Sequence, residues 1–229
     1  MANIFVHLIV IVSLIITGCV SNLPPPSTLP THSLAERIDA VENRIPVKEW
    51  FKWNEKTLFD RMDHYNVPGV SIAVINSDEI EWAKGYGTLE VGSNKSVTPD
   101  TLFQSASIGK SLTAIATMQL VETGYLSLDE NVNDKLVSWK VPENRFTKQK
   151  KVTPRMLLSH SAGMTVHGFR GYAEGEKIPT LLQILDGKPP ANNEAIRVDN
   201  IPGNEFRYSG GGFQVAQQLL EDVKNEPFS

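Results

Sequence analysis

Apolar and polar side chains alternate with a period of two residues in the stretch "VPGVSIAVINSDEIEWAKGYG", residues 67–87. This alternation predicts two β-strands, at about 70–75 and 80–86. Between them, Asn76-Ser77-Asp78 supplies residues typical of a tight turn. The preceding residues 33–64 are predicted to be helical, in two pieces broken at Ile45-Pro46. Helices followed by an antiparallel hairpin favour the α+β fold class over a parallel βαβ sheet.

Apolar residues cover nearly every side of the stretch from Ser107 to Thr123, which predicts a central, buried helix. They are Ile108, Leu112, Ile115, Ala116, Met118, Leu120 and Val121. Gly124 follows and suits the left-handed position just beyond a helix end. Thr153-Pro154 is typical of an N-cap followed by proline at the first helical position, and predicts a short helix through Leu158.

A last amphipathic helix is predicted after Gly212. Its apolar side carries Phe213, Ala216, Leu219, Leu220 and Val223. Residues 165–200 combine weak periodicity with scattered Gly and Pro, so no element is assigned to them.

The first 19 residues differ in character from the rest. An apolar run at 4–16 leads into Ile16-Thr17-Gly18-Cys19, and it is too short for an ordinary membrane span. Its ending resembles the lipobox of bacterial lipoproteins, which implies a lipid on Cys19, although "MANIFVH" at its start has no Lys or Arg. A plain signal peptide or an uncleaved anchor helix remains open. The proline-rich residues 20–33 then predict an extended tether, which leaves 34–229 as the folded domain.

Composition limits the classes of function. The 229 residues include 41% hydrophobic and 21% charged residues, with a net charge of −4, as in an ordinary globular protein with one sizeable domain or at most two small ones. No basic stripe stands out, so we expect no nucleic-acid partner. With a single cysteine there is no internal disulfide. His160 and His167 lack the spacing of a helical zinc pair, so neither a metal nor another cofactor is expected.

The stretch "QSASIGKSLTA", residues 104–114, has two interpretations. Gly109-Lys110-Ser111 matches the end of a phosphate-binding loop. Such a loop needs a glycine where this chain has Gln104, and no suitable parallel strand precedes it. The nucleotide-binding interpretation therefore fails.

The second interpretation is a nucleophilic serine with a lysine three residues later. If Ser107 is the helix N-cap, a capping box would place Glu or Gln at the position of Lys110. The helix dipole disfavours a cation there and favours the neutral amine. Residues at i and i+3 lie on one helix face, so this amine could activate the Ser107 hydroxyl. Ser-x-x-Lys alone is a weak signal in a chain of this length.

Five segments of the chain, one of which contains this Ser-x-x-Lys, strengthen it. They are "VPGVSIAVI", "TPDTLFQSASIGKSLTA", "LVETGYLSLDENV", "VTPRMLLSHSAGM" and "PGNEFRYSGGGF", in this order. Together they resemble the serine β-lactamase-related family, which includes class C β-lactamases, D-amino-acid peptidases and esterases. The resemblance implies a β-lactamase/transpeptidase-like fold, with an antiparallel sheet and a helical subdomain.

The resemblance also implies roles for individual residues. Ser107 would be the acylated nucleophile and its backbone amide half of the oxyanion hole. Lys110 would accept the proton, and Tyr208 would be the second acid/base group. Gly210 stands where β-lactamases of this class have a substrate-binding asparagine, which weakens the case for β-lactam turnover. His160 could be a triad histidine, but a role in shaping a loop near the site is favoured.

One motif of the family is missing. No Lys-Thr-Gly or His-x-Gly follows Tyr208, so we expect a fragment or a truncated product without the C-terminal sheet strands. The predicted function is that of a serine hydrolase working through an acyl-enzyme on an ester, a D-amino-acid peptide or a β-lactam. The alternative is a non-catalytic lipoprotein that binds peptidoglycan or β-lactams. The expected location is the bacterial cell envelope, lipid-anchored and facing the periplasm, or alternatively outside the cell.

Overall fold

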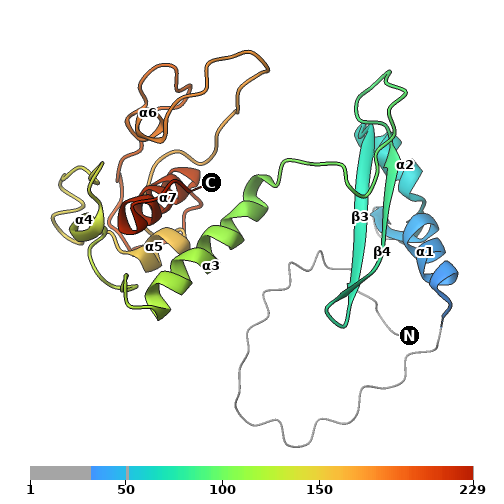
Figure 1. The fold of residues 1–229 in the computed structure, drawn as a ribbon, viewed down its shortest axis with the longest axis horizontal. Helices are drawn as coiled ribbons and strands as arrows, with labels where there is room; N and C mark the ends of the chain where they lie inside the picture. Colours follow the sequence, from blue (N-terminus) through green and yellow to red (C-terminus); the bar gives the residue numbers. More distant parts are fainter. Residues whose placement is uncertain (1–31, 50–51, 229) are drawn as a thin grey trace, which may run out of the picture. The chain divides into compact units, whose positions relative to one another are not determined.

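The computed structural model describes residues 32–49 and 52–228, and these divide into two compact units, one up to Leu102 and one from Phe103 (Figure 1). The predicted signal segment, Cys19 and nearly all of the tether lie outside the described residues. Within the described ranges, no helix combines the length and apolar character needed to cross a membrane.

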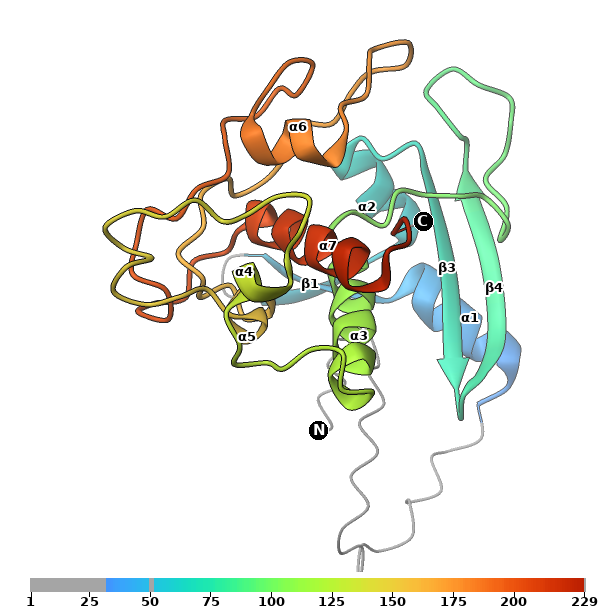
Figure 2. The same ribbon diagram turned by 60° about the vertical axis from the view of Figure 1, so that its left-hand side comes forward.

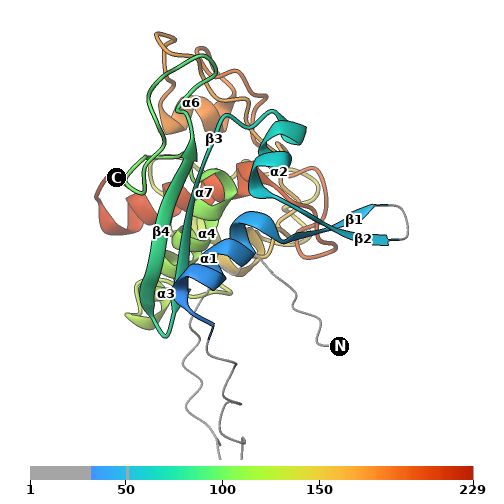
Figure 3. The ribbon, with the colours of Figure 1, turned by 90° about the vertical axis from the view of Figure 1, so that its right-hand side faces the viewer.

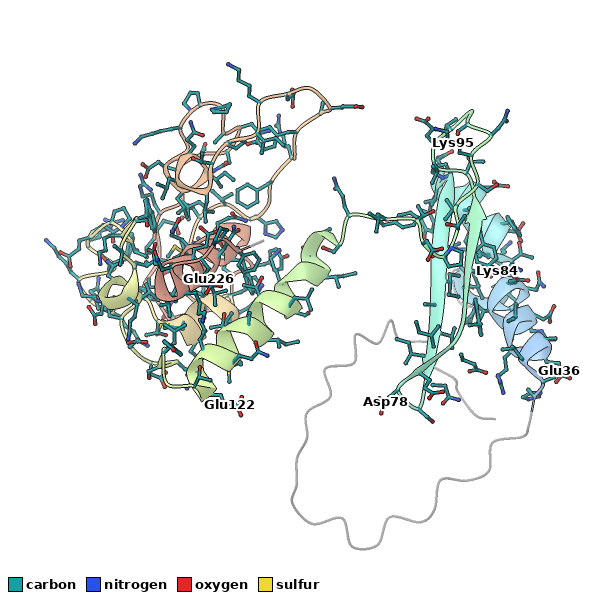
Figure 4. The ribbon with its side chains drawn as sticks, in the orientation of Figure 1. Glu36, Asp78, Lys84, Lys95, Glu122 and Glu226 are labelled. Carbon is teal, nitrogen blue, oxygen red and sulfur yellow. The ribbon has the colours of Figure 1, made fainter. Side chains whose placement is uncertain are left out.

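The first unit opens with two capped helices, α1 (Leu34–Asn43) and α2 (Leu58–Tyr65). The hydroxyl of Ser33 accepts a hydrogen bond from the backbone N–H of Glu36, whose carboxylate binds the Ser33 amide in return. Figure 4 labels Glu36 at this end of α1. Thr57 and Asp60 form the same reciprocal cap at the start of α2. Each cap satisfies backbone groups that a helix start would otherwise leave unpaired.

The two predicted helical pieces and the break at Ile45-Pro46 are confirmed, but the expectation that helix resumes directly after the break is wrong. β1 (Ile45–Glu49) pairs antiparallel with β2 (Lys52–Lys56), with Ile45 opposite Lys56 (Figure 3). Pro46 has no amide hydrogen for a helix interior and restricts the residue before it to extended backbone. The chain therefore leaves α1 at Asn43 and continues as a strand.

The predicted hairpin is confirmed as β3 (Gly69–Asn76) and β4 (Glu79–Gly87). The turn residues Ser77 and Asp78 both have positive φ, 51° and 65°, which suits the twist of a two-residue hairpin. Asp78 marks this turn in Figure 4. A small core of Leu58, Met62 and Tyr86 joins α2 to the hairpin.

The second unit is helical, and its longest helix is α7 (Gly210–Lys224). α7 packs against α3 (Gly109–Glu122), α4 (Val132–Lys135), α5 (Pro154–Leu158) and α6 (Leu181–Asp186) (Figure 2). The main core of this unit is assembled around it, and its members include Leu136, Leu157, Met164, Leu185, Ile196, Val215 and Leu219. The predicted apolar side of α7 is thus confirmed, although the helix begins at Gly210 instead of after Gly212.

α3 ends where the sequence predicts, with Gly124 at a φ of 76°. The expectation of a fully buried helix is wrong. Thr117 and Leu120 are buried, whereas Leu112 is 67% exposed and Met118 is 46% exposed. Within its own unit the helix packs one face against α7 and leaves the other uncovered.

The smaller helices follow local signals. Thr153 caps α5 and Pro154 is its first residue, as predicted. α6 lies inside the segment that carried no assignment. Its signal was a capping box of Thr180 with Gln183, followed by Gly187 in the left-handed conformation.

Candidate active site

A pocket of about 620 Å³ lies in the second unit, between the start of α3, the start of α7 and the segment 167–169. Its lining residues include Ser107, Lys110, Thr113, His167, Phe169, Tyr208, Gly210, Phe213, Gln214 and Gln217. All four residues predicted for catalysis and substrate binding are in this set. Phe169, Gln214 and Gln217 were not predicted, because nothing in the local pattern marks a residue that faces a pocket.

Ser107 lies in a single turn of 3₁₀ helix, Ala106–Ile108, directly before α3. Ala106 has a φ of 45°, a conformation that costs a non-glycine residue about 1–3 kcal/mol. Such strain persists where surrounding contacts enforce it, and it is typical of functional sites. The Ser107 side chain is exposed, so a substrate could reach its Oγ atom.

The expectation that Ser107 is the N-cap of the helix is wrong. α3 follows the 3₁₀ turn with Ile108 in the cap position, and the Ser107 hydroxyl bonds to other side chains. Lys110 Nζ donates to Ser107 Oγ at 3.2 Å, and the Tyr208 hydroxyl lies 2.7 Å from the same atom. The hydroxyl is thus held by two groups that can exchange protons with it.

Lys110 lies one turn after Ser107, on the same side of the helix. Its Nζ is 5.2 Å from the centre of the Tyr208 ring and 5.6 Å from the centre of the Phe213 ring. Both rings present their electron-rich faces to the amine, which stabilises a cation. The hydrogen bonds of Tyr208 to Lys110 and to Ser107 lower the pKa of the phenol, because they stabilise the phenolate.

Tyr208 directly precedes Ser209, which caps α7. The Ser209 hydroxyl accepts from the Gly212 amide at 2.9 Å and donates to the Thr165 carbonyl at 2.8 Å. These two bonds fix the backbone directly after Tyr208. Ring contacts with His160 and His167 also position the phenol, at centroid distances of 4.3 and 4.9 Å.

His160 is close to the cluster but does not bond to Ser107 in the structure. Its Nδ1 accepts a hydrogen bond from the Ser209 amide at 3.1 Å, and its ring is stacked on Tyr208. Burial, followed by the nearby charge of Lys110, lowers the pKa of His160. This arrangement is not a Ser-His pair, and it agrees with the favoured structural role.

Gly210, the first glycine of the run 210–212, lies close to a neighbouring segment. A Cβ on Gly210 would lie 3.1 Å from the His167 carbonyl oxygen and 3.1 Å from the Phe169 ring. The Gly210 amide donates to that same carbonyl at 3.0 Å. The segment 167–169 therefore occupies the space that a larger side chain at position 210 would need.

Groups of three or more His, Cys, Asp or Glu side chains that could hold a metal ion do not occur among the residues that the structure describes. The chemistry available in the pocket is that of a hydroxyl, an amine and a phenol at hydrogen-bond distance.

The family model described as Beta-lactamase matches residues 54–229 of the chain. The chain therefore belongs to the β-lactamase family, which confirms the predicted family and its fold. The match spans most of the described residues and includes every residue discussed above in the pocket.

Individual relatives agree with this assignment. The chain is 30% identical over 178 residues to an unguisins hydrolase of Aspergillus campestris, covering 71% of this chain and 30% of that protein. It is similar to the octameric penicillin-binding protein homologue from Pyrococcus abyssi, with 31% identity, a TM-score of 0.57, and coverage of 74% of this chain and 38% of that one.

A third similar protein is the D-amino acid amidase from Ochrobactrum anthropi, with 25% identity and a TM-score of 0.57, covering 74% of this chain and 44% of that one. The chain spans less than half the length of each of these three proteins.

Proposed function

We propose that the protein carrying this chain is a serine hydrolase that works through an acyl-enzyme on Ser107. The observation that carries the proposal is the hydrogen-bonded cluster in the pocket, in which Lys110 and Tyr208 both reach Ser107 Oγ. A hydroxyl held by an amine and a phenol that can exchange protons with it, in an accessible pocket, is the arrangement that nucleophilic catalysis requires.

The proposed reaction begins when Ser107 Oγ bonds to the carbonyl carbon of the substrate. Its proton passes to the pair formed by Lys110 and Tyr208, both of which lie at hydrogen-bond distance from Ser107 Oγ. The pair then returns the proton to the leaving group as the bond between that group and the carbonyl carbon breaks. Water attacks the resulting ester by the reverse sequence and releases the acid.

The proposed substrate is an ester, a D-amino-acid peptide or a β-lactam. Hydrolysis of unguisins and of D-amino acid amides is named for two of the relatives, which supports a carbonyl substrate of this kind. We propose that short esters are hydrolysed faster than β-lactams. Position 210 has no side-chain amide, and the Phe169 ring lies 3.1 Å from where a Cβ at this position would be. A substrate that depends on such an amide loses more by its absence.

The test of the nucleophile is covalent labelling with a fluorophosphonate probe, followed by peptide mapping. Ser107 should be the labelled serine, and Ser107→Ala should abolish labelling. Ser111→Ala is the matched control, because Ser111 is on the same helix and should not affect labelling. Labelling that persists in Ser107→Ala would contradict the proposal. A wild-type protein that binds penicillin reversibly without acylation would favour the non-catalytic binding protein instead.

Substrate preference is tested by comparing hydrolysis of a nitrophenyl ester and of nitrocefin by the same preparation. The ester should give the higher kcat/KM. A clear preference for nitrocefin would show that recognition does not depend on an amide at position 210.

We also propose that Cys19 carries lipid and anchors the protein in the bacterial cell envelope. The support is the apolar run ending in Thr17-Gly18-Cys19 and the proline-rich tether that follows. Metabolic labelling with a clickable fatty acid should mark the wild-type protein, and Cys19→Ser should release it from the membrane fraction. Equal membrane retention of both forms would favour an uncleaved anchor helix.

A further inference from the structure

The backbone on either side of Tyr208 is bound by one residue, His160. The Arg207 amide donates to the His160 carbonyl oxygen at 2.7 Å, and the Ser209 amide donates to His160 Nδ1 at 3.1 Å. Between these two bonds, the imidazole stacks on the phenol ring with a centroid distance of 4.3 Å and an interplanar angle of 29°. Backbone and ring of Tyr208 are thus held from the same side.

We propose that His160 is a positioning residue that holds Tyr208 within hydrogen-bonding range of Ser107, and that only its neutral imidazole can do so. This deepens the proposed function and rests on it, because Tyr208 matters for catalysis only if Ser107 is the nucleophile. The hydrogen on the neutral ring is carried by Nε2, since Nδ1 accepts from the Ser209 amide.

His160 is placed to support Tyr208, and it is not a catalytic residue. Its acceptor nitrogen is already used by a backbone amide, so it has no free lone pair to take a proton from the nucleophile. The pocket is lined by Tyr208 and His167, and His160 lies behind the phenol. Phe206 and Phe213 contact the other sides of its ring, which fixes the stack.

Protonation would break this arrangement. A protonated imidazole donates at both nitrogens, so Nδ1 would meet the Ser209 N–H as one donor facing another. The titratable side chains that face His160 are Lys110 on α3, Tyr208 beside it, and His167 in the adjacent segment. The Lys110 ammonium would repel the new charge.

Arg207 is a further cation whose backbone contacts His160, and its guanidinium is bound to Asp199 and to the Met164 carbonyl. It is therefore engaged by other groups. Burial and the charge of Lys110 keep the pKa of His160 below its ordinary value, so the imidazole is neutral at neutral pH. Tyr208 should be released only as the solution becomes acidic.

Two substitutions remove the titration of His160 in different ways. His160→Asn keeps an acceptor near Nδ1 but removes the ring and its titration, and asparagine tolerates the φ of 54° found here. His160→Phe keeps a ring for the stack but removes the acceptor and the titration. His64→Asn, at an exposed position in α2, is the matched control for the substitution itself.

The first readout does not depend on catalysis. Ultraviolet titration of the phenolate, compared with the Tyr208→Phe protein, reports the pKa of Tyr208. In His160→Asn this pKa should move back toward the ordinary tyrosine value, because the phenol is no longer held beside Lys110. The control His64→Asn should leave it unchanged.

The second readout is the pH profile of ester hydrolysis. In the wild type, kcat/KM should fall as the solution becomes acidic, with a midpoint below about pH 6.5, the ordinary pKa of histidine. Both His160 variants should lose this acidic step and show a kcat/KM about 10²-fold lower at neutral pH, the cost typical of misplacing a catalytic group by about 1 Å. The effect should fall on kcat more than on KM.

Two outcomes would overturn the proposal. One is an unchanged Tyr208 titration in His160→Asn. The other is a lower kcat/KM in the His160 variants with the acidic step still present, because such a result would show that His160 has a merely structural role. Failure of the proposed function would be recognised separately, because Ser107 would then escape the fluorophosphonate probe in the wild type while the Tyr208 titration could still respond to His160.

Discussion

Replacing Tyr208 with phenylalanine removes a single hydroxyl group from the centre of the cluster. The hydroxyl lies 2.7 Å from Ser107 Oγ, while the ring is stacked on His160. Phenylalanine preserves the ring and therefore the stack. The substitution isolates the proton-transfer role of Tyr208 from its contribution to packing.

The expected size of the effect distinguishes two explanations. If the hydroxyl only makes an ordinary hydrogen bond, its loss costs about 0.5–1.5 kcal/mol, which lowers the rate by about tenfold at most. If the hydroxyl exchanges a proton with Ser107, its loss should lower the acylation rate by about 10²–10⁴-fold. We expect the larger effect, because Lys110 and Ser107 lower the pKa of this phenol and so favour its proton-accepting form.

Single-turnover acylation by a nitrophenyl ester measures this rate directly. Above the acidic step assigned to His160, the wild-type rate should rise further with pH as Tyr208 loses its proton, and the Phe variant should lack this second rise. The melting temperature should change by less than about 4 °C, since no packing contact of the ring is removed. A rate loss below about tenfold, or an unchanged pH profile, would refute the role of Tyr208 in proton transfer.

Three further predictions follow from the same structure. Lys110→Arg should slow acylation nearly as much as Lys110→Ala, because a guanidinium does not accept protons; an active arginine variant would show that only the charge matters. Asp222→Ala should lower the free energy of unfolding by about 2 kcal/mol in urea titrations, because the carboxylate accepts the backbone N–H groups of residues 137–138. Burial raises the pKa of Asp222, but its hydrogen bonds outweigh this and lower the pKa overall. The contribution of Asp222 to stability should therefore be present above about pH 4 and lost as the pH falls through the pKa of the folded protein. A stability difference between the two proteins that does not depend on pH would contradict this. Gly211→Ala should destabilise the protein by about 1–3 kcal/mol, since a Cβ there would lie 2.6 Å from a backbone carbonyl oxygen. Gly168→Ala is the control, and it should leave the stability unchanged because the space around Gly168 is open.

Local sequence signals determined much of the secondary structure. The alternation at 67–87 and its turn residues were sufficient for the β3–β4 hairpin, because period and turn chemistry act over a few residues. Thr153-Pro154 located the start of α5 and Gly124 the end of α3 for the same reason. The strands at 45–56 were missed, because Pro46 signals only that a helix stops and not that the next residues will pair.

The pairing of Ser107 with Lys110 was also contained in the sequence. Residues three apart lie on one side of a helical turn whatever the rest of the chain does. The 3.2 Å bond between them is therefore a local consequence of their spacing.

The rest of the site was decided by tertiary structure. Tyr208 is 101 residues away from Ser107 in the chain, and only the packing of α7 against α3 brings its hydroxyl to 2.7 Å from Oγ. The resemblance to a family could name Tyr208, but no local pattern could place it.

The same holds for the residues around Tyr208. His160 contacts the backbone amides on both sides of Tyr208, and the segment 167–169 lies close to position 210. Both arrangements arise where segments distant in sequence approach each other. Backbone spacing determines which side chains are neighbours along one element. Only the packing of several elements determines which groups meet across a pocket, because that depends on every contact that holds those elements together.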